Sequence, residues 1–308
     1  MLLFYVLRVS MVLRIGTDCS GIEAPLIALK SLNIEYSQIW RCDNDTFTNK
    51  TAEANFKKPN LLFTDITTRN NKKLPEIDLY VCGFPCQPFS TIGERKGILD
   101  PRSNVISAML DTIKESKPKI LILENVLGFK SISDGKMYSN LIEILSEKYS
   151  INASVYNTKK FGLPQNRQRI YFVGIRKDIQ KKDFIKPKEK KMRALREILD
   201  LQLKGVSNIY KDRGYNIKTD MEFNIINTVF STQRKIMYNI VPTIATNSNS
   251  HFIYELNRPL TIIELLLLQG FPKKFKQVVN NSQFKKQIGN SMSVPVLKYI
   301  IKEALKCI

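Results

Sequence analysis

The first half of the chain alternates short apolar runs with stretches of helical periodicity, and this alternation restricts the fold more than any other feature. Runs that read as strands occur at residues 13–17, 38–42, 79–82, 120–123 and 171–175. Stretches with helix-like patterning lie between the first of them, at residues 24–32 and 46–56. Strands that alternate with helices predict an α/β fold with a parallel sheet covered on both faces.

The composition changes after residue 176, which predicts a second, smaller part. Residues 177–191 are dense in lysine, as in a solvated hinge or a strip that faces phosphates. Periodicity then stays weak until helical patterning returns at residues 260–269 and again at residues 293–305. We expect a large catalytic and cofactor-binding domain and a small target-recognition domain, formed by residues 1–176 with 287–308 and by residues 177–286.

The charge balance favours a polyanionic partner, because 48 lysines and arginines face 28 aspartates and glutamates, for a net charge of +20. A lysine-rich genome composition is the alternative explanation. Five cysteines without CxxC pairs and a single histidine argue against a zinc module and fit a reducing cytoplasm. We expect no metal, no membrane span and no signal peptide, with Met11 as the true start and the chain as a monomer.

The sharpest motif is Gly-Phe-Pro-Cys-Gln-Pro-Phe-Ser at residues 83–90. It follows an apolar strand, so it lies at a carboxyl end, where open α/β sheets bind ligands. Pro85 and Pro88 stiffen the turn around Cys86, and a thiolate held there is a strong nucleophile. A buried structural cysteine is the alternative, but a loop between two prolines is a poor place for one.

Two further polar segments adjoin predicted strands. Glu124 ends an apolar strand, so it falls at the same sheet edge as Cys86, where a carboxyl can act as a general acid. Arg167 and Arg169 precede the strand at 171–175 and project from one face of an extended chain, as suits a carboxylate, phosphate or base edge. Taken singly, these residues could be a solvated strand end and an ordinary basic strand entry.

Together the three segments resemble the C5-cytosine DNA methyltransferases, whose Pro-Cys-Gln, Glu-Asn-Val and Gln-x-Arg-x-Arg motifs occur in this order. Residues 18–25 resemble the family's cofactor loop, residues 258–272 its ninth motif and residues 289–291 its tenth. The resemblance implies a Rossmann-like S-adenosylmethionine-dependent methyltransferase domain that acts on double-stranded DNA. The residues that it implies for cofactor binding are Asp18, Cys19, Ser20, Gly21, Ile22, Asp43, Asn44, Asp65, Ile66, Pro85, Asn290 and Ser291.

The cofactor loop departs from the family pattern Asp-x-Phe-x-Gly-x-Gly-Gly. Thr17 holds the acidic position, with Asp18 one place later, and Cys19 holds the aromatic one. Glu23 and Ala24 replace the last two glycines, which implies a loop less able to approach a ligand closely.

The resemblance also implies the roles of the catalytic residues. Cys86 would add to carbon 6 of a flipped-out cytosine, and Glu124 would hold ring nitrogen 3 and the exocyclic amine. Arg167 would contact the base carbonyl, while Arg169 positions the neighbouring carboxylate. Residues 90–102 look like a mobile loop that closes over the DNA. The residues implied to contact DNA are Gln87, Ser90, Arg95 and Lys96.

Three alternatives stay open at this point. A transfer-RNA cytosine-5 methyltransferase would share the scaffold and the basic charge. A catalytically inactive DNA-binding homologue would have lost Cys86, Glu124 or Arg167, and all three are present. A dinucleotide-binding oxidoreductase would carry a GxGxxG loop, which is absent.

Overall fold

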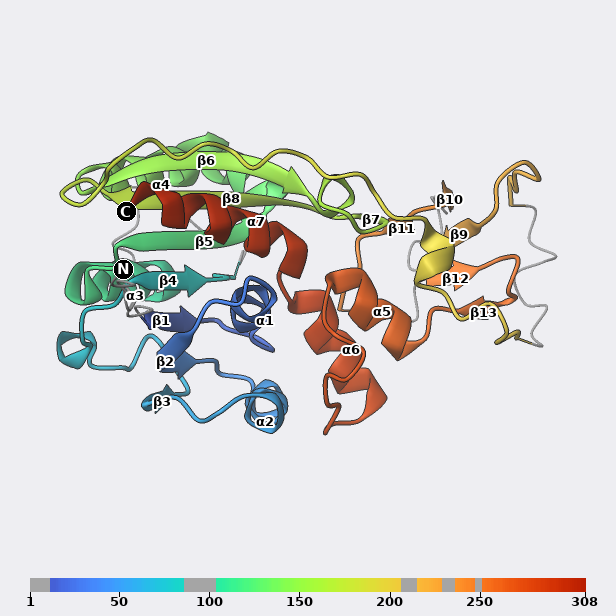
Figure 1. Ribbon diagram of the computed structural model, residues 1–308, viewed down its shortest axis with the longest axis horizontal. Coiled ribbons are helices and arrows are strands. Elements are labelled where there is room, and N and C mark those ends of the chain that lie inside the picture. Colours follow the sequence, from blue (N-terminus) through green and yellow to red (C-terminus); the bar gives the residue numbers. More distant parts are fainter. Residues whose placement is uncertain (1–11, 86–103, 206–214, 229–235, 247–250) are drawn as a thin grey trace, which may run out of the picture.

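The computed structural model of the protein describes residues 12–85, 104–205, 215–228, 236–246 and 251–308. Two parts lie side by side along the longest axis of the molecule (Figure 1). The larger part contains a seven-stranded sheet and the smaller a four-stranded sheet, with helices α5 (Ile262–Gln269) and α6 (Asn281–Asn290) between them. A large α/β part with a smaller companion is what the sequence predicted.

The large sheet has the strand order β3-β2-β1-β4-β5-β8-β6. Its strands are β1 (Leu13–Asp18), β2 (Tyr36–Cys42), β3 (Leu61–Phe63), β4 (Leu79–Cys82), β5 (Ile120–Val126), β6 (Tyr149–Asn157) and β8 (Gln168–Arg176). Five of them, β3 to β5 in this order, are parallel, so their carboxyl ends meet at one edge of the sheet.

The prediction of a parallel sheet is wrong for one strand. β8 runs antiparallel to both β5 and β6, with Glu124 paired to Tyr171 across the β5–β8 ladder. The reason is local: β6 leads into β8 through residues 158–167 without a crossover helix, and two strands joined in this way must run in opposite directions.

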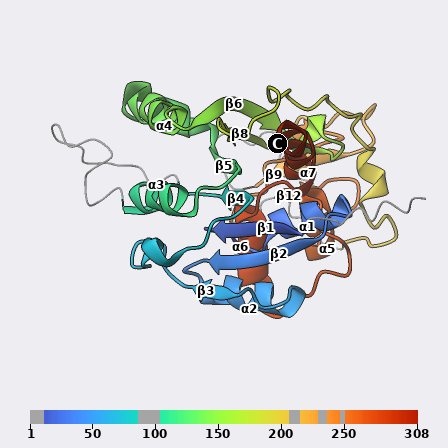
Figure 2. The same cartoon turned by 60° about the vertical axis from the view of Figure 1, so that its left-hand side comes forward.

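Helices cover both faces of the large sheet, as Figure 2 shows. α1 (Ala24–Ser31) and α7 (Val294–Ala304) pack on one face, and α3 (Asn104–Ser116) and α4 (Lys136–Ser146) on the other. Side chains alternate accordingly: Ile120 and Ile122 of β5 belong to the α1 side of the core, whereas Leu121 and Leu123 belong to the α3 side. Burial on both faces explains why these strands are continuous apolar runs.

The C-terminal helix returns to the large sheet after the small part. α7 buries an apolar face that includes Val296, Leu297, Ile300 and Ile301, and it lies beside α1. The end of the chain therefore packs on the large part of the molecule.

The lysine-rich segment 177–191 is fixed along the large part of the molecule rather than free. Lys181 N donates to the carbonyl of Cys307 at 2.7 Å, and Lys190 N donates to that of Lys160 at 2.8 Å. The ammonium of Lys190 lies 5.3 Å from the ring centroid of Tyr299 on α7. Anchored at both ends, the segment is an exposed basic strip and not a hinge.

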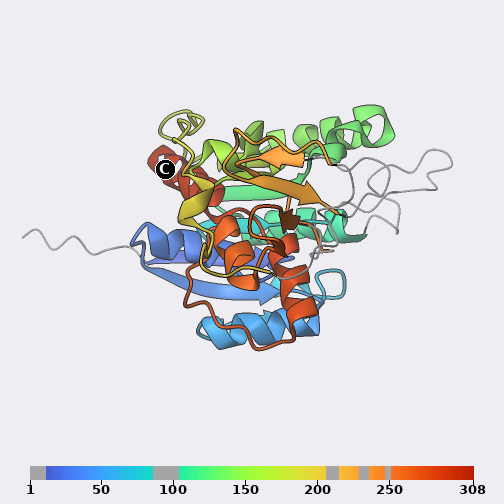
Figure 3. The same cartoon turned by 90° about the vertical axis from the view of Figure 1, so that its right-hand side faces the viewer.

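The small sheet has the strand order β10-β9-β12-β13 and lies toward the viewer in Figure 3. Its strands are β9 (Asn224–Asn227), β10 (Ile236–Tyr238), β12 (His251–Ile253) and β13 (Arg258–Pro259). The short strands β7 (Gln165–Asn166) and β11 (Val241–Pro242) pair with each other and join the two parts. No helix within the described ranges is long and apolar enough to cross a membrane.

Candidate active site

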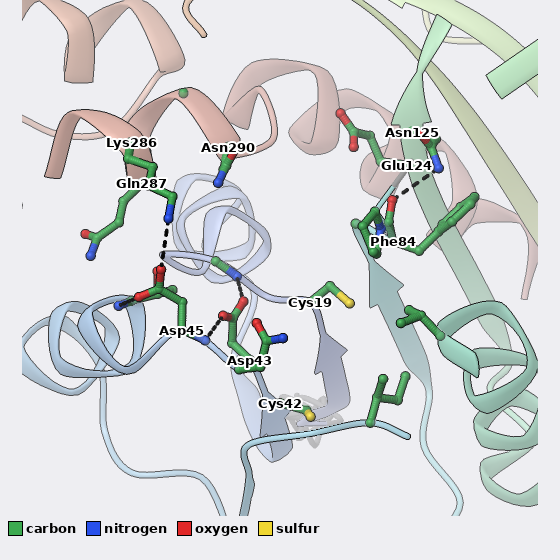
Figure 4. Close-up of a pocket in the computed structure, with 18 of the residues that line it drawn as sticks. Cys19, Cys42, Asp43, Asp45, Phe84, Glu124, Asn125, Lys286, Gln287 and Asn290 are labelled. Atoms are coloured by element: carbon green, nitrogen blue, oxygen red, sulfur yellow. Dashed lines mark hydrogen bonds and ion pairs between the residues drawn. The ribbon is translucent and has the colours of Figure 1, made fainter. Parts of the chain in front are cut away.

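A cavity of about 570 Å³ opens at the carboxyl edge of the large sheet, where loops after β1, β2, β3 and β4 meet the end of β5 and helix α6 (Figure 4). This is the edge at which α/β sheets bind ligands. Most of the predicted site residues line it, namely Cys19, Gly21, Asp43, Asn44, Asp65, Ile66, Pro85, Glu124, Arg167, Arg169 and Asn290. Residues from position 19 to position 290 therefore meet around one space.

Other predicted residues lie elsewhere. Cys86, Gln87, Ser90, Arg95 and Lys96 fall outside the described residues, although the described chain reaches Pro85, which lines the cavity. Asp18, Ser20, Ile22 and Ser291 are buried and do not line it.

The carboxylate of Asp18 is engaged by other side chains of the protein. Its carboxylate forms a bidentate ion pair with Arg69, with both N–O distances at 2.7 Å. Trp40 Nε1 at 3.0 Å and the Tyr80 hydroxyl at 2.8 Å also donate to it. With both oxygens engaged and no exposed surface, Asp18 ties the end of β1 to its neighbours.

At one end of the cavity, Glu124 lies against an arginine. Arg169 Nε is 3.3 Å from Glu124 Oε1, and both side chains are largely buried. Burial raises the pKa of Glu124, while the charges of Arg167 and Arg169 oppose that rise. A carboxyl with a raised pKa beside a cation can hold a proton for a reacting group.

Arg167 holds distant backbone segments together. Its Nη1 donates to the carbonyl of Ile244 at 3.0 Å and its Nη2 to that of Ser291 at 2.8 Å. The side chain is buried, and burial lowers its pKa to about 10, with the nearby charge of Arg169 acting in the same direction. The guanidinium thus joins the link between β7 and β8, the segment after β11 and the chain entering α7.

Asn125 is the middle residue of the Glu-Asn-Val motif, for which the sequence predicted no role. It supports the backbone that precedes Cys86. Its Nδ2 donates to the carbonyl of Phe84 at 3.1 Å (Figure 4). Phe84 packs edge-on against Phe129, with ring centroids 5.2 Å apart. The backbone two residues before Cys86 is therefore held between β5 and the core of the α3 side.

At the other end of the cavity, Asp43 accepts two backbone hydrogen bonds. Gly21 N lies 2.8 Å from Oδ2, and Asp45 N lies 3.0 Å from Oδ1 (Figure 4). Burial raises the pKa of Asp43, opposed by these two hydrogen bonds. Gly21 has a φ of +55°, and a Cβ placed there would meet no atom within 4 Å, so the backbone faces open space.

A family model matches nearly the whole chain. The model of the C-5 cytosine-specific DNA methylases matches residues 17–306. The chain belongs to this family. The methylase family depends on S-adenosylmethionine in general.

Several methylases are similar over most of the chain. The Type II methyltransferase M.HhaI of Haemophilus parahaemolyticus is 30% identical over 308 residues, covering 91% of this chain and 90% of the relative. M1.ScrFI of Lactococcus lactis subsp. cremoris is 32% identical, covering 87% and 72%. M.BsuFI of Bacillus subtilis is 33% identical over 83% of this chain, which spans 64% of that relative's length.

Solved structures support the same fold. The S. pombe Dnmt2 methyltransferase superposes with a TM-score of 0.71 at 21% identity, covering 96% of this chain and 98% of that one. The Entamoeba histolytica methyltransferase EhMeth gives 0.68 at 20% identity, covering 96% and 98%. At these identities the likeness shows that the chain shares the fold of these proteins.

Helix α6 contributes methylase site residues that sequence reasoning missed. Lys286 Nζ lies 3.7 Å from Asp45 Oδ2, and Gln287 Oε1 accepts from the Thr51 hydroxyl at 2.9 Å. Both side chains line the cavity and connect α6 to α2 (Thr46–Asn55). The only sequence signal was a polar stretch between the ninth and tenth motifs. Within the described ranges, no cluster of His, Cys, Asp and Glu could hold a metal ion.

Proposed function

We propose that this protein transfers a methyl group from S-adenosylmethionine to carbon 5 of a cytosine in double-stranded DNA. One observation carries the proposal: a single cavity joins the Glu124–Arg169 pair to the Gly21–Asp43 loop, at the edge where β4 leads into Cys86. A base and a cofactor held at opposite ends of this cavity would face each other.

The cofactor end fits the proposed ligand. The cavity is large enough for a nucleoside-sized molecule. Asp43 offers a half-buried carboxylate suited to ribose hydroxyls, and Ile66 and Asp65 offer an apolar side chain and a polar group suited to a purine. When bound there, S-adenosylmethionine supplies an electrophilic methyl group.

The protein's own groups perform the remaining steps. The target atom is hidden in a stacked duplex, so the cytosine must be flipped into the cavity, at a cost of a few kcal/mol. The Cys86 thiolate adds to carbon 6, which makes carbon 5 nucleophilic. Glu124, whose pKa is raised by burial, donates a proton to ring nitrogen 3 and stabilises the adduct. Loss of the carbon-5 proton after methylation then expels the Cys86 thiolate.

The two arginines make different contacts, which favour different roles. The hydrogen bonds of Arg167 to Ile244 and Ser291 favour a supporting role for this guanidinium. Arg169 stays at the Glu124 carboxylate, so it is the better placed of the two to contact the base carbonyl. This division gives Arg169 the base contact that was expected of Arg167 from the sequence, and it keeps Arg169 at the neighbouring carboxylate as expected.

Tritiated methyl transfer tests the proposal when duplex DNA and transfer RNA are offered side by side. We expect incorporation into duplex DNA, at one short sequence that bisulfite sequencing identifies. Incorporation only into transfer RNA would support the alternative substrate. No incorporation into either, with DNA binding retained, would support the inactive homologue.

A further inference from the structure

The loop between β1 and α1 is tightly curled, and it contains a buried glutamate in an unusual conformation. Cys19, Gly21 and Glu23 have φ angles of +46°, +55° and +62°. Glycine adopts this left-handed region freely, whereas other residues adopt it at a cost of roughly 1–2 kcal/mol. Glu23 has no exposed surface. A strained, buried carboxyl in a ligand loop must be held by specific contacts.

Those contacts connect the loop to two strands. Glu23 Oε1 accepts from the Thr17 hydroxyl on β1 and from Gln38 Nε2 on β2, both at 3.0 Å. Gln38 Nε2 also donates to the Thr17 hydroxyl at 3.0 Å, which closes a triangle of buried side chains. The glutamate therefore fastens the loop to the strands on either side of it.

An irregularity in β2 brings the required side chains together. The register passes from Ile15–Gln38 to Gly16–Trp40, so Ile39 is an extra residue in β2. Such a bulge shifts the alternation of side chains, and it directs both Gln38 and Arg41 toward Glu23. Without the extra residue, positions 38 and 41 would face opposite sides of the sheet.

The charge of Arg41 links the buried side chains of Thr17, Glu23 and Gln38 to the cavity residue Asp43. The buried Arg41 acts electrostatically on both Glu23 and Asp43, and its Nη2 lies 3.2 Å from Glu53 Oε1. Tyr36 of β2 is the other titratable group whose charge is coupled to Glu23. Burial raises the pKa of Glu23 to about 7, and the Thr17 hydrogen bond and Arg41 oppose that rise.

Backbone hydrogen bonds connect Glu23 to the wall of the cavity. Glu23 N donates to the Ser20 carbonyl at 3.1 Å, and Ser20 N donates to the Cys42 carbonyl at 3.3 Å. Gly21, enclosed between them, directs its N–H to Asp43 at 2.8 Å and faces the cavity.

We propose that Glu23 is a positioning residue for the cofactor: its buried carboxyl takes the place of a loop glycine and holds Gly21 and Asp43 in cofactor-binding geometry. The inference rests on the proposed function, because it takes S-adenosylmethionine as the ligand of this loop. Glu23 does not line the cavity, so it acts through the loop and not by contact.

Isothermal titration with S-adenosylhomocysteine, an unreactive product, measures the effect directly. Glu23→Ala removes the anchor, and we expect affinity to fall by about tenfold or more, the equivalent of one or two buried hydrogen bonds. Glu23→Gln keeps an oxygen acceptor for Thr17 and Gln38, so its affinity should stay within about threefold of wild type. Glu23→Gly relieves the positive φ and should still bind weakly, because it lacks the anchor.

Steady-state kinetics give a second readout. In Glu23→Ala the KM for the cofactor should rise, while kcat at saturating cofactor changes by less than about threefold. Glu53→Gln is the matched control, since Glu53 contacts the same Arg41 from the exposed side, and its cofactor affinity should equal wild type.

Wild-type affinity in Glu23→Ala or in Glu23→Gly would overturn the inference. If the Glu23 variants do not fold, Gln38→Ala removes one donor to the carboxyl, and unchanged affinity there would overturn it equally. Wild-type protein that binds no S-adenosylhomocysteine at all would instead refute the proposed function.

Discussion

The guanidinium of Arg167 donates a hydrogen bond to the carbonyl of Ser291 at 2.8 Å, across 124 residues of sequence. The same side chain reaches the carbonyl of Ile244. One buried arginine thus connects the link between β7 and β8, the segment that follows β11 and the turn before α7. The shape of the cavity depends on where these three segments meet.

Arg167→Lys should loosen this junction. A lysine has one ammonium and no planar fork, so it cannot span both carbonyls. We expect the free energy of unfolding to fall by about 2 kcal/mol, as for a lost buried charge-assisted hydrogen bond, with a large loss of activity. Urea unfolding measures the first effect. Arg193→Lys, at an exposed pair with Glu197, serves as control and should change neither quantity; equal effects in both variants would contradict the junction.

Cys86→Ala should abolish methyl transfer while DNA binding survives, because the thiolate is required only for the covalent step. Duplex DNA that contains 5-fluorocytosine should become covalently attached to the wild-type protein, since fluorine blocks the release step. Denaturing electrophoresis detects the adduct. Turnover by Cys86→Ala, or trapping through Cys82, would reject Cys86 as the nucleophile.

Glu124→Gln keeps the shape of the side chain and removes its proton. We expect turnover to fall by roughly 10²-fold or more, the usual scale for a positioned general acid. Since burial raises the pKa of Glu124, wild-type activity that needs the protonated carboxyl should decline as pH rises through that pKa. The variant should lack this decline in a pH–rate profile. A variant with the wild-type rate and pH dependence would rule out an acid role.

Glu23 should make stability depend on pH. Its pKa is about 7 in the folded protein against 4.5 as its ordinary value, so the folded state binds the proton more tightly between these limits. The contribution of this group to the free energy of unfolding is therefore fully present below pH 4.5. It is lost as pH rises toward 7, by roughly 3 kcal/mol in all. Chemical unfolding of wild type and Glu23→Gln at pH 5 and pH 8 measures the difference. An equal pH dependence in both proteins would mean that Glu23 does not carry this proton.

A chain that ends at Lys286 should lose cofactor binding. The truncation removes Gln287 and Asn290 from the cavity wall, and it removes α7, whose apolar face packs beside α1. Asn290→Ala tests the wall alone, because it keeps the helix, and it should weaken binding to a lesser degree. Isothermal titration gives both affinities, with circular dichroism as a check on folding. Truncated protein that binds S-adenosylhomocysteine within a few-fold of full length would exclude the C-terminus from the cofactor site.

Local sequence pattern was sufficient to locate the central strands, several helices and the chemical groups of the site. Buried parallel strands must be apolar on both faces, so β1, β4 and β5 could be located from their composition. Pro85 and Glu124 lie at the carboxyl ends of two such strands, and these ends share an edge of the sheet, so their place at one cavity could be inferred. Met137, Leu141 and Leu145 recur every fourth residue, so the same pattern could have revealed α4, which the prediction missed.

The partners of the buried polar groups, in contrast, depend on how distant segments pack together. Nothing near Asp18 in sequence indicates that Arg69 occupies its carboxylate, and nothing near Arg167 indicates Ile244 and Ser291. The direction of β8 and the place of α6 against the cavity likewise depend on how the chain returns through space. Short-range periodicity reports which side of an element is buried; it carries no information about which buried polar side chain from another element satisfies its hydrogen bonds.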